Sequence, residues 1–132
     1  MARLTAGLRA RAILRLVETG GGFGAVLRRG DETAGDLLLK LRDPAGVVDL
    51  YAPATAPDGT AAWLRLGRPG FPDEAAAEAA VARAVARDPD LWVLELEPAA
   101  PGFPLPEPVL DAPAALDPSR AAAEALFRAR RA

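Results

Sequence analysis

Apolar residues recur at helical spacing in two stretches of the chain, and this pattern predicts two amphipathic helices. The first covers residues 5–19 and ends at a run of three glycines, residues 20–22. Its apolar face is predicted to hold residues spaced i, i+4, i+5, i+8 and i+9, namely Leu8, Ala12, Ile13, Leu16 and Val17. The second covers residues 74–87, carries a stripe of alanine and valine, and follows Asp73, a suitable N-cap residue.

Five further runs have the alternating or continuous apolar pattern of strands. They cover residues 23–28, 36–41, 47–52, 61–66 and 91–96, and the first four are separated by short stretches rich in glycine, proline and aspartate. The fifth follows Asp88-Pro89-Asp90, where the proline ends the preceding helix. Because its residues are almost all apolar, we expect it to be a buried, central strand.

These elements predict an α+β fold with a five-stranded, mostly antiparallel sheet. The first four strands are expected to form a meander, since only short turns separate them, and the fifth is expected to return into the same sheet after the second helix. Both helices are expected to cover one face of that sheet. The predicted domain spans residues 1–97.

A change of composition marks the end of this predicted domain. Seven prolines stand between Pro98 and Pro118, so residues 98–117 are predicted to be an extended, Pro-rich segment without helix or strand. Its apolar residues suggest that the first part crosses the surface of the domain: Phe103, Leu105, Val109 and Leu110. Residues 118–132 are predicted to form a C-terminal helix with Asp117 as its N-cap, either docked on its own domain or available to a partner.

Composition excludes several classes of function. The chain has no Cys, His, Asn or Gln, one Ser and one Lys, so it can build neither a Ser-His-Asp triad nor a Cys/His zinc site. Acid–base chemistry would fall to carboxylates, Lys40 or Tyr51. The formal net charge of −2 argues against a broad nucleic-acid interface, and no apolar run approaches the ~18 residues of a membrane span. We therefore expect a cytoplasmic protein without a cofactor.

Three cations are the candidate ligand-binding residues. Arg28 and Arg29 flank a loop with two glycines, and together with Lys40 they could hold a phosphate or carboxylate. The alternative is an ordinary ion pair between Lys40 and Asp49 on the next strand. No metal site is predicted, although a Mg²⁺-dependent enzyme would draw its ligands from the acidic residues around the fifth strand, Asp88, Asp90, Glu95 and Glu97.

Several short stretches carry a resemblance to a known family. The most distinctive is Asp88-Pro89-Asp90-Leu91-Trp92-Val93; the others are Arg28-Arg29-Gly30-Asp31, Leu37-Leu38-Leu39-Lys40, Leu50-Tyr51 and Trp63. Over about residues 3 to 97 the chain resembles an uncharacterised family of short alphaproteobacterial proteins, a domain of unknown function. In that family the last strand is usually followed by a Gly-Arg step and a His, whereas here Gly102-Phe103-Pro104 stands instead. The resemblance implies the domain limits and no activity.

Two classes of function follow from the residues. Scarce catalytic residue types and the edge strands of a meander favour a small non-catalytic module that binds a protein partner or associates with itself. The alternative is an anion- or nucleotide-binding protein, or a carboxylate- and Mg²⁺-dependent enzyme, that uses Arg28, Arg29, Lys40 and the acidic strand.

Overall fold

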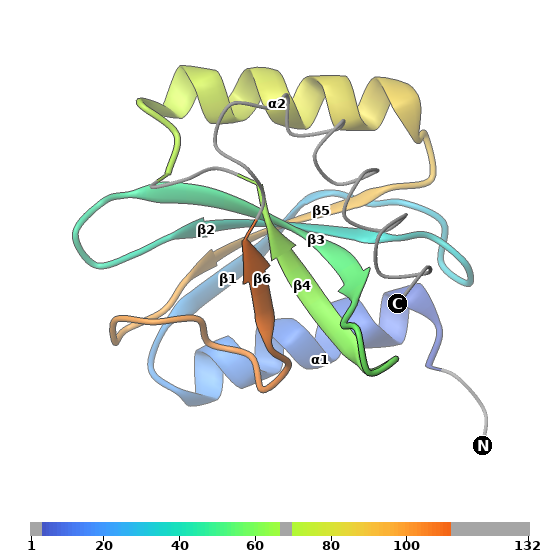
Figure 1. Ribbon diagram of the computed structural model, residues 1–132, viewed down its shortest axis with the longest axis horizontal. Coiled ribbons are helices and arrows are strands. Elements are labelled where there is room, and N and C mark those ends of the chain that lie inside the picture. The colour runs from blue at the N-terminus through green and yellow to red at the C-terminus, as the bar shows by residue number, and fades with distance from the viewer. Residues whose placement is uncertain (1–3, 67–69, 112–132) are drawn as a thin grey trace.

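The computed structural model of the protein describes residues 4–66 and 70–111. Within them, one six-stranded sheet lies between two helices, with α2 on one face and α1 on the other (Figure 1). The elements in chain order are α1 (Ala6–Thr19), β1 (Phe23–Arg28), β2 (Leu37–Arg42), β3 (Val48–Thr55), β4 (Ala61–Arg65), α2 (Glu74–Arg87), β5 (Trp92–Glu97) and β6 (Val109–Asp111).

Both helices begin at the residues that the sequence predicted. The Thr5 side chain accepts a hydrogen bond from the amide of Leu8, and Asp73 does the same for Ala76, so each cap satisfies an amide that has no partner within the helix. The predicted bounds of α1 are confirmed, but its predicted apolar face is wrong, because Leu8 and Leu16 are exposed. The buried face consists of Ala6, Gly7, Ala10, Ile13 and Val17.

The rotation of α1 follows from its first turn. The amides of Ala6 and Gly7 donate to the carbonyl oxygens of Thr33 and Glu32 at 3.2 and 2.9 Å. A Cβ atom at position 7 would stand 2.0 Å from a Glu32 carboxylate oxygen, so the glycine leaves room for the Glu32 side chain beside the helix. Small residues therefore face the sheet at this end of the helix, and the larger leucines turn to the outside.

The order of strands in the sheet is β1-β5-β2-β3-β4-β6. Strand β5 pairs with β1 in antiparallel fashion and with β2 in parallel fashion, and β6 runs parallel to β4. The hairpin between β2 and β3 is confirmed, with Gly46 at φ +89° in its turn. The central position of β5 is also confirmed.

The predicted fold class is wrong in four respects. The sheet has six strands instead of five, and it is mixed instead of mostly antiparallel. The first four strands do not form a meander, because β5 separates β1 from β2. The helices do not share a face, because β2 and β5 carry apolar side chains on both of their faces, and each face needs a cover.

Two hydrophobic layers result, one on each side of the sheet. The layer beneath α1 contains Trp92, Leu94 and Leu96 of β5, and the layer beneath α2 contains Leu91 and Val93. Trp92 is almost fully buried, and its indole N–H donates to the carbonyl oxygen of Asp31 at 2.7 Å. Trp92 is thus part of the core on the α1 side of the sheet.

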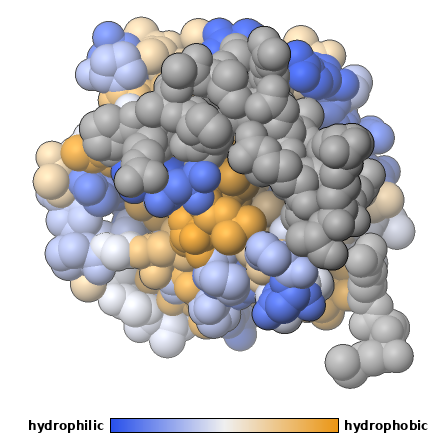
Figure 2. Space-filling view, viewed as in Figure 1, coloured by the Kyte–Doolittle hydropathy of each residue, from blue (hydrophilic) through white to orange (hydrophobic). Residues whose placement is uncertain are grey.

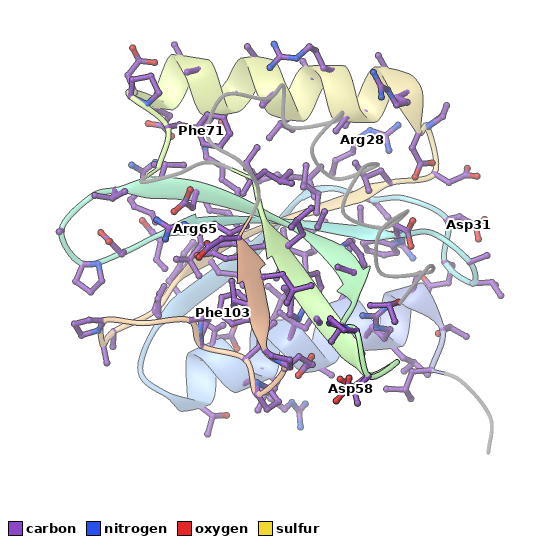
Figure 3. The ribbon with its side chains drawn as sticks, in the orientation of Figure 1. Arg28, Asp31, Asp58, Arg65, Phe71 and Phe103 are labelled. Carbon is purple, nitrogen blue, oxygen red and sulfur yellow. The ribbon has the colours of Figure 1, made fainter. Side chains whose placement is uncertain are left out.

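The Pro-rich segment contributes to the first of these layers. Leu105 is buried there, and the Phe103 ring lies 4.7 Å from the Tyr51 ring, on the α1 side of the sheet (Figure 3). The prediction of a segment without strands is wrong. The three residues after Pro108 include no proline, so they keep the backbone N–H groups that strand pairing needs, and they form β6 at the edge of the sheet.

The predicted domain limit at Glu97 stays a prediction. Cooperative unfolding of a chain that ends there would support it, whereas the burial of Leu105 argues for a folding unit that extends further. The predicted C-terminal helix, residues 118–132, lies outside the described residues.

Candidate functional site: the Lys40 cluster and the open edge of the sheet

Lys40 lies at the centre of a network of carboxylates. Its side chain is 3% exposed, and its ammonium bonds Glu74 at 2.9 Å and also Glu78, both on the first two turns of α2. Glu95 of the neighbouring β5 lies 3.6 Å away. The predicted pairing with Asp49 is wrong, because Lys40 stands opposite Leu50 and Asp49 opposite Leu41 in the β2–β3 ladder.

The partners of Lys40 keep it charged. Burial disfavours the ammonium, but the hydrogen bonds to Glu78 and Glu74 outweigh this effect and raise the pKa of Lys40 above its usual value. The pKa of Glu74 is lowered in turn, mainly by its hydrogen bond from Lys40 and next by its hydrogen bond from Arg42. An ammonium held by three carboxylates ties α2 to the sheet and has little capacity left for an external anion.

Arg42 extends this network along the same face of β2. Its guanidinium contacts Glu74, lies 3.9 Å from Glu95 and lies 3.4 Å from Glu97. Two cations thus meet four carboxylates, so the group carries a net charge of −2. We call this group the Lys40 cluster: Lys40, Arg42, Glu74, Glu78, Glu95 and Glu97.

The other two predicted ligand-binding residues have partners elsewhere. Arg28 donates to the carbonyl oxygen of Leu91 at 2.7 Å, just beyond the C-terminal end of α2, whereas Lys40 lies under its N-terminal end (Figures 1 and 3). Arg29 contacts Glu32 at 3.2 Å and lies 5.8 Å from the centre of the Trp92 ring. The structure therefore does not bring Lys40 together with the two arginines.

The loop between Arg29 and Asp36 is occupied by its own chain. The amide of Asp31 donates to the carbonyl oxygen of Asp90, and the Asp31 carboxylate accepts the amides of Thr33 and Ala34. Cβ atoms at Gly30 and Gly35 would stand 2.1 and 2.4 Å from that Asp90 oxygen. The two glycines thus admit the turn before β5, and no phosphate is needed to explain them. That turn is itself fixed by Asp88, which accepts the amide of Asp90.

Asp49 is a buried carboxylate with one bonded oxygen. Its Oδ2 accepts from Arg65 at 2.7 Å, and its Oδ1 is the one buried side-chain polar atom without a hydrogen-bond partner in the part of the chain that the structure describes. Burial raises the pKa of Asp49 to about 6 against the opposing effect of Arg65, and the charges of Asp111 and Asp43 add to the rise. A carboxyl of this kind titrates near neutral pH.

A hollow of about 870 Å³ lies between the start of α1 and the end of the β3–β4 hairpin. Its charged lining residues are Arg9, Asp36 and Glu107. Arg9 lies 6.0 Å from the centre of the Trp63 ring, and Glu107 accepts the Trp63 indole N–H at 3.3 Å. Arg9 and Glu107, two of the three charged groups, therefore contact the buried Trp63. The buried carboxylate of Asp49 is not part of the lining.

The two edges of the sheet differ in length and in exposed apolar area. Strand β6 has three residues, and apolar residues near it gather at the centre of the face shown in Figure 2, where β4 and β6 lie in Figure 1. Strand β1 has six, and three of its side chains are large, apolar and exposed: Phe23 at 54%, Val26 at 44% and Leu27 at 47%. Only an irregularity between Val26 and Arg28 interrupts its pairing with β5.

Known proteins share this fold. A crystal structure of a DUF1491 family protein from Caulobacter crescentus CB15 is 36% identical and superposes with a TM-score of 0.72, covering 82% of this chain and 100% of that one. An NMR structure of a DUF1491 family protein from the same source gives 37% identity, a TM-score of 0.70 and coverage of 83% and 99%. Protein Atu0922 from A. tumefaciens is 30% identical, with a TM-score of 0.65 and coverage of 86% and 100%.

The model of a family described as "Protein of unknown function (DUF1491)" matches residues 4–105. The chain belongs to the DUF1491 family. The resemblance found in the sequence is thereby confirmed at the level of a family of unknown function, and the solved relatives named above come from alphaproteobacteria. That the stretch from Asp88 to Val93 marks DUF1491 proteins stays a prediction. None of the curated proteins matches this chain.

Sequence reasoning missed most of the Lys40 cluster. Glu74 and Glu78 stand one helical turn apart, and Lys40 and Arg42 alternate on one strand, so each pair was visible as a shared face. What the pattern lacked was the pairing order that brings β2 next to β5. Within residues 4–66 and 70–111, no group of three or more acidic residues could hold a metal ion, and no helix could cross a membrane.

Proposed function

We propose that this DUF1491 protein is a non-catalytic protein-binding module, and that the open edge of β1 is its binding surface. The observation that carries the proposal is the exposure of Phe23, Val26 and Leu27 on one six-residue edge strand. An edge strand offers unpaired backbone N–H and C=O groups, and natural proteins usually protect such edges with charge, proline or short length. Addition of a partner strand would satisfy these groups and cover the apolar side chains.

The described residues support a binding role over the alternative. Lys40, which an anion site would need, is surrounded by carboxylates, and Arg28 and Arg29 bond the protein's own groups. The acidic residues of β5 are bound to Lys40 and Arg42. The anion-binding role of Arg28, Arg29 and Lys40 stays a prediction, and these contacts weigh against it.

The test compares two variants that make the same substitution at equal exposure. Val26→Lys places a charge on the open edge, whereas Val47→Lys places it in the β2–β3 turn, where the valine is 42% exposed compared with 44% for Val26. Each protein is purified from the native host, and bound proteins are quantified. A stoichiometric partner retained by wild type and Val47→Lys but lost by Val26→Lys supports the proposal. Equal retention by both variants contradicts it.

A further inference from the structure

The face of β1 on the α2 side borders an acidic surface, and this observation deepens the proposed function, on which it rests. Residues that pair across an antiparallel ladder point to the same side of the sheet. Phe23 pairs with Glu97 and Ala25 pairs with Glu95, so the row next to the open edge is acidic. Both glutamates belong to the Lys40 cluster, whose net charge is −2, and Glu97 is 40% exposed.

The opposite face of β1 is apolar. Gly24 and Val26 pair with Leu96 and Leu94, both of which face α1. A Cβ atom at Gly24 would stand 2.7 Å from Cδ2 of Leu14, so the glycine lets this leucine of α1 lie over the edge strand. A strand added beside β1 would therefore meet Leu14 and Val26 on one face, and on the other face Phe23 and Ala25 with the carboxylates of β5 one strand beyond.

From these two faces we infer that the partner is an extended segment of another protein in which Lys or Arg alternates with aliphatic residues. It adds a strand along Phe23–Val26, the regular part of the β1 ladder. Its basic side chains lie over Ala25, two strand spacings or about 10 Å from β5, within reach of Glu95 and Glu97. The exposed Phe23 ring offers a further contact to a cation.

Charge complementarity favours this partner over a second copy of the chain. In a dimer joined through two β1 strands, each copy would present Phe23, Ala25 and Arg28 to the acidic row of the other. Arg28 is the one cation on that strand, and it already donates to the carbonyl oxygen of Leu91, so β1 of a second copy brings no further cation to the row. A basic segment supplies what the acidic row lacks.

Three seven-residue peptides test the inference: alternating Lys and Val, alternating Glu and Val, and the first composition rearranged into blocks. Each is titrated into ¹⁵N-labelled protein, and amide shifts are followed by NMR. The alternating Lys–Val peptide is expected to shift the amides of Phe23–Val26 and to bind at least about tenfold more tightly than the Glu–Val peptide. Its affinity should fall with added salt and by about two- to threefold in Glu97→Gln.

Val26→Lys and Val47→Lys provide the matched controls. Loss of the Lys–Val response in Val26→Lys, with retention in Val47→Lys, supports the inference. Two results would overturn the inference and leave the proposed function standing. One is equal binding of the Glu–Val or block peptide at β1. The other is a native partner that needs Val26 while the Lys–Val peptide does not bind. Concentration-dependent dimerisation that Val26→Lys abolishes identifies a second copy as the occupant and also overturns the inference.

Discussion

Substitution of Asp49 by Asn should change how stability depends on pH. Burial raises the pKa of Asp49 from 3.8 to about 6, so between these values the folded protein binds a proton more tightly than the unfolded chain does. Stability therefore falls as pH rises through this window, because the folded state must accept a buried charge. A shift of about 2 units corresponds to about 3 kcal/mol.

Asp49→Asn removes this titration and keeps an oxygen for Arg65. Its new amide group lacks a partner at the position of Oδ1, which costs about 1–3 kcal/mol at every pH. The free energy of unfolding of the variant minus that of wild type should therefore rise by about 2–3 kcal/mol between pH 4 and pH 8. This difference cancels the titration of distant groups common to both proteins.

Urea unfolding followed by the fluorescence of the buried Trp63 and Trp92 measures the difference. Asp58→Asn is the control, because the Asp58 carboxylate is exposed and its hydrogen bonds from Thr60 lower its pKa. Asp58 adds stability above its usual pKa of 3.8 and loses it only as pH falls below that value, so the difference for its variant should stay nearly constant over most of the range from pH 4 to pH 8. A constant difference for Asp49→Asn across this pH range would refute the buried, proton-binding state of Asp49.

Three other outcomes are expected. Lys40→Met should destabilise the protein by roughly 1–3 kcal/mol in urea unfolding, because it leaves Glu74 and Glu78 without their shared cation. The loss is limited, since both glutamates are half exposed and can regain water. Unchanged stability would show that Lys40 does not hold α2 on the sheet. Trp92→Ala should cost about 3–5 kcal/mol through a cavity, and a stably folded variant that had lost only binding would contradict a structural role. Phosphate and sulfate should raise the melting temperature no more in wild type than in Lys40→Met; a specific, Lys40-dependent rise would revive the anion site.

The helices and strands could be predicted from the sequence because their ends are set locally. Thr5 and Asp73 cap the helices, and Gly46 sits in the β2–β3 turn. The order of the strands could not be predicted in this way, because pairing depends on contacts between distant residues. The apolar run at Leu91–Leu94 did indicate a buried strand, whereas the similar run at Leu37–Leu39 was assigned to a meander; both runs belong to interior strands covered on both faces.

The candidate site was harder to predict for the same reason. The single lysine drew attention to position 40, but its partners Glu74 and Glu78 come from a helix more than thirty residues away in the chain. The charge of Arg28 was visible, but its partner is a backbone carbonyl that no sequence pattern marks. The open edge of β1 could not be predicted either, because it depends on β5 pairing with the opposite edge of the strand.

Hydrogen exchange of the complex with the native partner is the sharpest test of strand addition at β1. Backbone amides of β1 that face away from β5 exchange with solvent in the free protein and should become protected when a partner strand is added. New protection is expected only in Phe23–Arg28 and the adjoining surface of α1. It should be absent in Val26→Lys and retained in Val47→Lys. Protection that leaves β1 unchanged and appears around the hollow lined by Arg9 and Glu107 would contradict strand addition at β1.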